Sequence, residues 1–177
     1  MTGLSKVYGD LRAVDGLTFS VQPGEVLGLV GPNGAGKTTT LRCIGGILPP
    51  NAGEIRIGGH DLGKAPVEAK RALAFLPDEP RLFEYLTVKE HLALVARLYG
   101  VDGAEAKGRR LLEELELAGK EDALPGELSR GMTQKLVLAC GFLHDPALIV
   151  LDEPLTGSAP PAIPARKRPP AAPPGAG

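Results

Sequence analysis

The sequence is poor in several residue types and patterns that would indicate a particular class of protein. Its 177 residues include no tryptophan, only two cysteines and 4% aromatic residues. Two cysteines argue against a disulfide framework and fit a reducing compartment. The longest apolar stretch, residues 136–143, is far shorter than the about 20 residues of a membrane span, and the N-terminus lacks the apolar region of a secretory signal. We therefore expect a soluble, cytoplasmic chain.

The sequence also lacks an excess of positive or negative charge, since the formal net charge is −1. Without a basic excess, nothing points to nucleic acid as the main partner. What is abundant is glycine and proline, with 24 and 17 residues, and they are unevenly spread. Seven of the prolines fall within residues 158–177, whereas 22 of the glycines precede residue 158. The composition predicts a globular body of ordinary domain size over 1–157 and a Pro/Ala-rich tail, disordered over 158–177.

Apolar runs and turn residues predict alternating strands and helices, and thus an α/β fold. Buried strands are expected at 26–30, 73–76 and 147–151, and a short alternating strand at 53–58. The first helix is expected to present Leu41, Ile44 and Leu48 on one face. A capping box at Thr87 and Glu90 predicts a helix that Gly100 ends. Further helices are expected at 104–117 and, capped by Ser129, at 129–144.

Residues 31–38, Gly-Pro-Asn-Gly-Ala-Gly-Lys-Thr, match the pattern G-x-x-x-x-G-K-[ST]. Its glycines allow backbone N–H groups to turn toward phosphate oxygens, and the helix that follows adds the partial positive charge of its N-terminus. Lys37 would reach the β- and γ-phosphates, and the Thr38 hydroxyl would bind Mg²⁺. The alternative is an ordinary glycine-rich turn. The expected strand before and helix after the loop favour the phosphate site.

An ATP site also needs an acidic residue at the end of a buried strand. Residues 148–153, Leu-Ile-Val-Leu-Asp-Glu, supply Asp152 as a magnesium partner and Glu153 as the acceptor of a proton from an attacking water. Taken alone, these two acids could simply end a strand in a solvated turn. A phosphate loop in the same sheet favours the metal site.

Three segments together resemble the nucleotide-binding domain of ABC transporters. They are GPNGAGKTT at 31–39, LSRGM at 128–132 followed by Gln134 and Lys135, and LIVLDEP at 148–154. The resemblance spans about residues 3–157. It implies a P-loop NTPase core, a mostly parallel sheet with flanking helices, an N-terminal antiparallel part and a helical insert at about 80–125. The wording of 76–80, LPDEP, and of the LSRGM segment is most similar to the branch that serves export-type permeases.

The resemblance implies ATP and Mg²⁺ as ligands and assigns roles by position. Glu153 would be catalytic, and Tyr8 would stack on adenine. Oxygens of Thr38, Asp78 and Asp152 would bind the metal. The phosphates would contact Gly31, Pro32, Asn33, Gly34, Ala35, Gly36, Lys37, Thr38 and Thr39. The ATP of an opposite subunit would contact the signature residues Leu128, Ser129, Arg130, Gly131 and Met132.

Some of these roles have plain structural alternatives. Tyr8 could be a strand-end tyrosine without a ligand. Asp78 stands where the family usually has Gln, in the loop that contacts Mg²⁺ and the permease, and could instead be a turn residue before Pro80. Ser129 could cap its helix and bind nothing else. The resemblance further implies a second ATP-binding domain, identical or different, and an integral membrane permease. These partners would hold the protein at the inner face of the cell membrane.

The chain departs from the family after Gly157. The family usually has T-G-L-D-P in this loop, here Thr-Gly-Ser-Ala-Pro at 156–160. It also has a further strand ending in a His, whereas the last histidine here is His144. We hypothesise a reading-frame shift near codon 157, the alternative being a genuine Pro/Ala extension. If the gene's other two frames do not continue with Leu-Asp-Pro and a downstream strand and His, the hypothesis is wrong.

Three functions follow from these observations. The first is the ATP-hydrolysing subunit of an ABC transporter. The second is an ATP-binding fragment with impaired catalysis, and the third is a soluble ABC-type protein that acts outside transport. Cys43 and Cys140 are expected to be core thiols. His60, His91 and His144 share no metal-like spacing and are expected at the surface or at helix caps.

Overall fold

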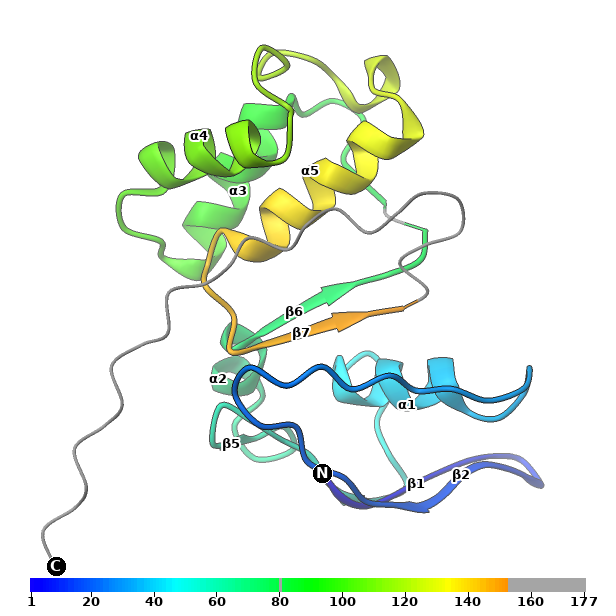
Figure 1. Ribbon diagram of the computed structural model, residues 1–177. Coiled ribbons are helices and arrows are strands. Elements are labelled where there is room, and N and C mark those ends of the chain that lie inside the picture. Colours follow the sequence, from blue (N-terminus) through cyan, green and yellow to red (C-terminus); the bar gives the residue numbers. More distant parts are fainter. Residues whose placement is uncertain (80, 153–177) are drawn as a thin grey trace, which may run out of the picture.

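The computed structural model describes residues 1–79 and 81–152 of the chain (Figure 1). Its N-terminal part is a three-stranded antiparallel sheet of β1 (Thr2–Tyr8), β2 (Leu11–Leu17) and β3 (Ala52–Glu54), in the order β2-β1-β3. The antiparallel part expected from the family resemblance is therefore present. The predicted tail at 158–177 and the Pro80 position lie outside the described residues.

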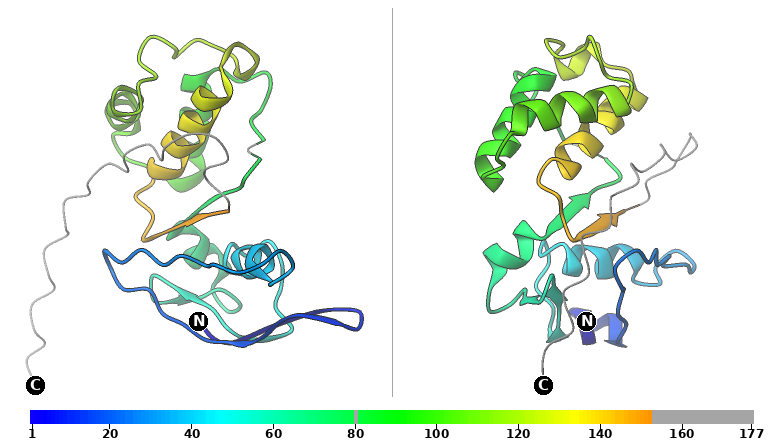
Figure 2. Two further views of the ribbon diagram at one scale, coloured as in Figure 1. Left: turned by 45° about the vertical axis from the view of Figure 1, so that its right-hand side comes forward. Right: turned by 60° about the vertical axis from the view of Figure 1, so that its left-hand side comes forward.

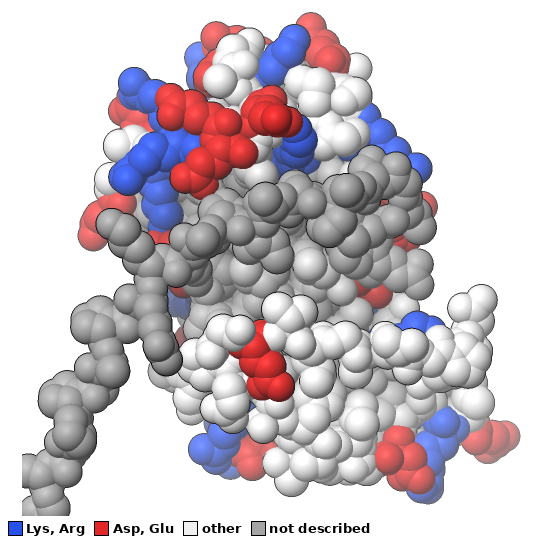
Figure 3. All heavy atoms as spheres, in the orientation of Figure 1, with Lys and Arg blue, Asp and Glu red and all other residues white. Residues whose placement is uncertain are grey.

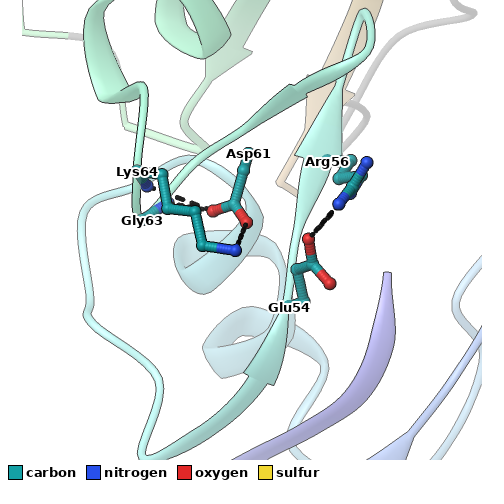
Figure 4. A network of polar contacts seen from close by, with 5 residues as sticks. All are labelled: Glu54, Arg56, Asp61, Gly63 and Lys64. Carbon is teal, nitrogen blue, oxygen red and sulfur yellow. Dashed lines mark hydrogen bonds and ion pairs between the residues drawn. The ribbon is translucent and has the colours of Figure 1, made fainter.

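A small hairpin follows, built from β4 (Arg56–Ile57) and β5 (His60–Asp61). Polar side chains fix its two ends (Figure 4). The Asp61 carboxylate accepts hydrogen bonds from the backbone N–H groups of Gly63 at 2.8 Å and Lys64 at 3.1 Å. The Arg56 side chain donates from Nε to the Glu54 carboxylate at 2.7 Å. The first pair of bonds closes the turn that leads into α2 (Pro66–Arg71).

The centre of the molecule is a parallel pair of strands, β6 (Leu73–Leu76) and β7 (Leu148–Leu151). Both confirm predicted strands; β6 is mostly buried, whereas in β7 only Val150 is buried and the other residues are half-buried. Side chains alternate between the two faces of the pair, as the period of a strand requires. On one face, Leu73 and Val150 join a core with Cys43 and Ile44 of α1 (Lys37–Ile44). On the other, Ile149 packs against a separate core.

That second core belongs to a helical part, which lies on the opposite side of the β6–β7 pair from α1 (Figures 1 and 2). Its helices are α3 (Val88–Tyr99), α4 (Ala104–Glu114) and α5 (Arg130–Phe142), with the 3₁₀ turn η1 (Pro125–Glu127) before α5. The buried residues that hold them together are Val88, Leu92, Leu111, Leu112, Leu115, Leu117, Leu136, Ala139, Phe142 and Leu143. The strand pair is thus covered on both faces, as parallel strands require.

The predicted helix boundaries follow from local signals. The Thr87 hydroxyl accepts from the Glu90 N–H while the Glu90 carboxylate accepts from the Thr87 N–H, which completes the expected capping box. Gly100 ends α3 in the left-handed conformation, with φ 65°. Ser129 caps α5 by accepting from the Met132 N–H at 3.3 Å. These bonds satisfy backbone groups that a helix end leaves open.

One strand prediction is wrong. Residues 26–30, expected as a buried strand, form no regular element, and Val26 and Val30 are 92% and 97% exposed. An apolar run becomes a buried strand only where a neighbouring strand supplies its hydrogen bonds. Within residues 1–79 and 81–152, β6 and β7 pair only with each other and no strand pairs with residues 26–30, so this run lies outside the sheets.

Smaller differences concern element ends. The strand expected at 53–58 is divided between β3 and β4, which pair with different partners. The first helix ends at Ile44, so Leu48 lies beyond it, although its side chain still packs on the core. The helix expected at 104–117 ends at Glu114. Leu115 and Leu117 are nevertheless buried, since the turn that follows returns them to the core.

The described surface carries both signs of charge. Acidic and basic side chains lie next to one another over the helical part (Figure 3). Among the described residues no helix has the length and apolar character needed to cross a membrane.

A lysine at Val26 tests the correction to the predicted strand. Because the side chain is almost fully exposed, Val26→Lys is expected to change the free energy of unfolding by less than about 0.5 kcal/mol. It is also expected to reduce aggregation, since exposed apolar side chains favour association. Urea unfolding and light scattering measure both effects. A loss of about 3 kcal/mol or more would instead mean that Val26 is buried, as the sequence predicts. Leu4→Lys, at a fully buried position, is the control for that loss.

Candidate functional site

The phosphate loop spans residues 31–36 and leads directly into α1. Gly34 and Gly36 have φ values of 83° and 81°, a backbone region that side chains rarely adopt. Gly36 has a second requirement, because a Cβ there would lie 2.2 Å from the Ala13 carbonyl oxygen of β2. The glycine therefore permits both the turn of the loop and its close approach to the N-terminal sheet.

Lys37 closes the loop on itself. Its ammonium group donates to the carbonyl oxygens of Gly31 at 2.7 Å and Pro32 at 2.8 Å. The Lys37 side chain therefore lies along the loop. To reach a phosphate, its ammonium group would have to leave these two carbonyls. Two neutral carbonyls hold the cation, and phosphate oxygens, being negatively charged, would form stronger charge-assisted bonds with it.

The N-terminus of α1 is open to an anion. No side chain caps it, and no acidic residue lies in its first turn. The partial positive charge of the helix end is therefore not offset locally. This follows from the sequence Gly-Lys-Thr-Thr-Thr at 36–40, in which the cap position is a glycine and only cationic and hydroxyl side chains follow. Backbone N–H groups at such an end favour phosphate.

Asp152 follows the last residue of β7 and is 6% exposed. Its backbone N–H donates to the Leu76 carbonyl at 3.0 Å, which extends the β6–β7 pairing by one residue and fixes the start of its side chain. A buried carboxylate at the carboxyl edge of a parallel pair is suited to a cation. Asp78 stands two residues beyond β6 and is exposed, so it begins at the same edge.

The core joins the phosphate loop to this acidic edge. Cys43 and Ile44 of α1 pack in the same cluster as Leu73 of β6 and Val150 of β7. Gly45, directly after the helix, leaves room for the Phe75 ring, from which a Cβ would lie 2.8 Å away. Helix α1 is therefore held on the face of the pair whose end carries Asp152. One core positions both halves of the predicted ATP site.

Tyr8 lies at the end of β1 and is 44% exposed. The Lys6 ammonium stands 5.3 Å from the centre of its ring. An exposed face and a nearby cation are compatible with a stacking role, and equally with an unliganded strand end. The Tyr8 role stays a prediction.

The signature residues begin α5. Ser129, Arg130 and Gly131 are exposed, whereas Leu128 and Met132 pack against the helical core. The Ser129 hydroxyl is engaged with the Met132 N–H, as capping alone would require. Glu153, the expected catalytic residue, lies outside the described residues.

The histidine predictions need one correction. His91, expected at the surface or at a helix cap, is 3% exposed and is one of the buried residues of α3. Its position was available from the sequence, because Val88, His91, Leu92 and Val95 follow the i, i+3, i+4, i+7 pattern of one helix face. The ring lies against residues that precede the helix, where it accepts a hydrogen bond from the Phe83 N–H.

Comparison with known proteins identifies the family of this chain. Residues 14–156 match the family model described as ABC transporter. The chain belongs to the ABC transporter family. The predicted resemblance and the P-loop α/β fold class are thereby confirmed.

Named relatives are ATP-binding proteins of export systems. The chain is 42% identical over 161 residues to a Nod factor export ATP-binding protein I of Paraburkholderia xenovorans (strain LB400), covering 90% of this chain and 53% of that protein. It is 44% identical over 156 residues to the SkfA peptide export ATP-binding protein SkfE of Bacillus subtilis (strain 168), covering 87% and 64%. The chain thus spans about half the length of the first of these relatives.

A solved structure, titled as the ATP binding subunit of an ABC transporter, is also similar. It superposes with a TM-score of 0.83 and 40% sequence identity, over 91% of this chain and 68% of the other.

A pair of glycine substitutions tests the close approach at the loop. Gly36→Ala is expected to destabilise the protein by more than about 2 kcal/mol, because it adds a clash to the unfavourable φ. Gly34→Ala, with a similar φ but open space around its Cβ position, is expected to cost about 1 kcal/mol. Urea unfolding followed by circular dichroism measures both. Equal losses would show that Gly36 does not pack against β2 in solution.

Proposed function

We propose that the chain is the ATP-binding and ATP-hydrolysing subunit of an ABC transporter and that it acts with a separate membrane permease. The observation that carries the proposal is the shared core of the site. An uncapped α1 with its glycine loop and a buried Asp152 are positioned by the same cluster of apolar side chains. A phosphate-binding element and a cation-binding element built on one support are what ATP with its metal requires.

The residues of the loop would bind the triphosphate. Lys37 would exchange its two carbonyl partners for β- and γ-phosphate oxygens, and backbone N–H groups at 34–38 would donate to the same groups. Glu153 would orient the attacking water and accept its proton. Hydrolysis then depends on fixed donors that meet the charge developing on the phosphate as it separates from ADP.

The donor set also fits Mg²⁺. Thr38 offers a hydroxyl oxygen, and Asp152 and Asp78 offer carboxylates, the oxygen ligands that this hard cation prefers. Asp152 is the strongest part of the fit, because a buried carboxylate favours a neighbouring positive charge. When bound, the metal supplies positive charge that offsets the β- and γ-phosphate oxygens.

The exposed start of α5 supports a partner that completes the site. Ser129, Arg130 and Gly131 are accessible at a helix N-terminus, and we assign them to the ATP of a second ATP-binding domain, identical or different. The permease would hold the protein at the cytoplasmic face of the membrane. Because the named relatives serve export systems, export is the direction of transport that we propose. Within the ATP site, Tyr8 would stack on the adenine.

A second candidate function is ATP binding with little turnover. Residues 26–30 lead into the phosphate loop without pairing in a sheet, with Val26 and Val30 exposed. The loop is therefore supported from α1 and β2 but has no strand behind it among residues 1–79. ATP binding tolerates a loosely supported loop better than ATP hydrolysis does, because hydrolysis needs the reacting groups to be closely aligned.

Two substitutions separate the candidates. Lys37→Ala is expected to weaken ATP binding at least about tenfold, because it removes the only side-chain cation in the motif. Glu153→Gln is expected to leave ATP binding intact and to remove steady turnover. Binding is measured with a fluorescent ATP analogue and turnover by phosphate release. Lys64→Ala, at a surface lysine with an 80% exposed side chain, is the control.

The possible outcomes are distinct. Turnover that Glu153→Gln abolishes supports the hydrolytic subunit and rejects the binding-only candidate. Binding without turnover in the unmodified chain supports the binding-only candidate. If Lys37→Ala binds ATP as well as Lys64→Ala does, neither candidate stands.

A further inference from the structure

His91 connects α3 to the segment that precedes it. The segment Arg81–Leu86 runs from the region after β6 to the cap residue Thr87. Its aromatic side chains are mostly exposed, Phe83 by 62% and Tyr85 by 89%. The histidine, in contrast, is 3% exposed. The imidazole is therefore buried next to a segment whose aromatic side chains are mostly exposed.

The ring makes two hydrogen bonds of opposite polarity to the backbone. The Phe83 N–H donates to Nε2 at 3.0 Å, so Nε2 carries no proton. Nδ1 lies 2.9 Å from the Thr87 carbonyl oxygen, which can only accept, so Nδ1 carries the proton. The neutral Nδ1–H form is the one that satisfies both partners.

These bonds hold a turn in place. The Leu86 N–H donates to the Phe83 carbonyl at 3.1 Å and closes the turn, and the Phe83 N–H bond to His91 ties it to α3. The Phe83 ring lies over the imidazole with centroids 6.1 Å apart and a tilt of 35°. Leu82 adds a contact with the helical core. The histidine thus makes the polar connection between the turn and the helix.

The turn segment borders a half-open pocket of about 220 Å³. It is mainly apolar, and His91 lines it together with Arg81, Phe83, Leu94, Leu98, Val137 and Cys140. A turn that borders an open pocket rests on fewer packed atoms than one laid on a filled core. Its position therefore depends strongly on its hydrogen bonds.

We propose that His91 is a positioning residue whose neutral Nδ1–H form fixes the turn 83–86 against α3, and whose protonation releases that turn. A protonated ring presents N–H groups at both nitrogens. The Nε2–H would then face the Phe83 N–H, donor against donor, and the bond would be lost. The bond to the Thr87 carbonyl would remain, and the Thr87–Glu90 capping box, which does not involve the imidazole, would keep the helix capped while the turn opens.

Charged and titratable groups near His91 come from the segment itself, from α3 and from α5. Arg81, from the segment, lines the same pocket. Glu90 precedes the histidine in α3, and the backbone N–H of Thr87 holds the pKa of its carboxyl below the ordinary value, so it stays ionised. Lys89 is paired with Asp122. From α5, burial raises the pKa of the Cys140 thiol to about 12, so that group stays neutral.

A consequence for transport rests on the proposed function. The segment begins just after Asp78, the residue to which the family resemblance assigns contact with Mg²⁺ and the permease. A released turn would loosen the element that links the site to its partner. The turn itself, however, is testable without nucleotide or permease.

The test is hydrogen–deuterium exchange of the full chain without nucleotide, compared with His91→Leu and His91→Gln. His91→Leu removes the acceptor and is expected to raise exchange in peptides covering 81–86 about fivefold to tenfold. His91→Gln retains an acceptor oxygen and is expected to restore most of the protection. His60→Gln, at an exposed histidine of β5, is the control and is expected to change nothing in these peptides.

The pH dependence distinguishes a switch from a merely structural contact. Between about pH 8 and about pH 5, where histidines change charge, the unmodified chain is expected to lose protection at 81–86, after correction for intrinsic exchange. His91→Gln has no charge to gain and is expected to keep its protection. If His91→Leu does not fold, this comparison decides alone.

Two results would overturn the proposal: equal exchange in the unmodified chain and a folded His91→Leu, or the same pH dependence in the unmodified chain and His91→Gln. A chain that shows the expected exchange but binds no ATP would contradict the proposed function and leave the positioning role of His91 standing.

Discussion

The structure depends on the pairing of β6 with β7. These two strands lie far apart in the sequence, at 73–76 and 148–151, and their backbone bonds bring the middle and the end of the described chain together. Each face of the pair then nucleates its own core, one with α1 and the N-terminal strands and the other with α3, α4 and α5. Without the pair, the phosphate loop and Asp152 would have no common support. The two acidic residues Asp78 and Asp152 emerge at one edge because the strands are parallel.

Local chemistry explains which features were predictable. The capping box at Thr87 and Glu90, the Ser129 cap and the Gly100 stop each involve groups within a few residues of one another, so the sequence alone identifies them. The strands at 73–76 and 148–151 were also predictable, because a short apolar run bounded by turn residues fits a strand covered on both faces. The glycine loop before Lys37 was identified by its spacing, which sets the backbone geometry directly.

Features that depend on distant partners were not predictable in the same way. Residues 26–30 have the composition of a buried strand, but a strand needs a neighbour, and composition says nothing about whether one is present. His91 gave a signal in its helical spacing, yet its hydrogen bond to Phe83 depends on the course of the preceding turn. The requirement for glycine at position 36 has two sources, and only the turn was visible in the motif. The Ala13 carbonyl that excludes a Cβ comes from another strand.

In the proposed ATP site, the bonds of Lys37 would make nucleotide binding an exchange of partners. The ammonium group already has two carbonyl acceptors at 2.7 and 2.8 Å, so a phosphate must replace them rather than fill an unmet need. That exchange is favourable because a charged oxygen binds a cation more strongly than a neutral carbonyl does. A ligand that offers only neutral oxygens gains little by it. The arrangement therefore selects for anionic groups at this position, and the open N-terminus of α1 adds to the same preference. In the proposed site, selectivity for phosphate would thus arise from competition within the loop as well as from attraction to it.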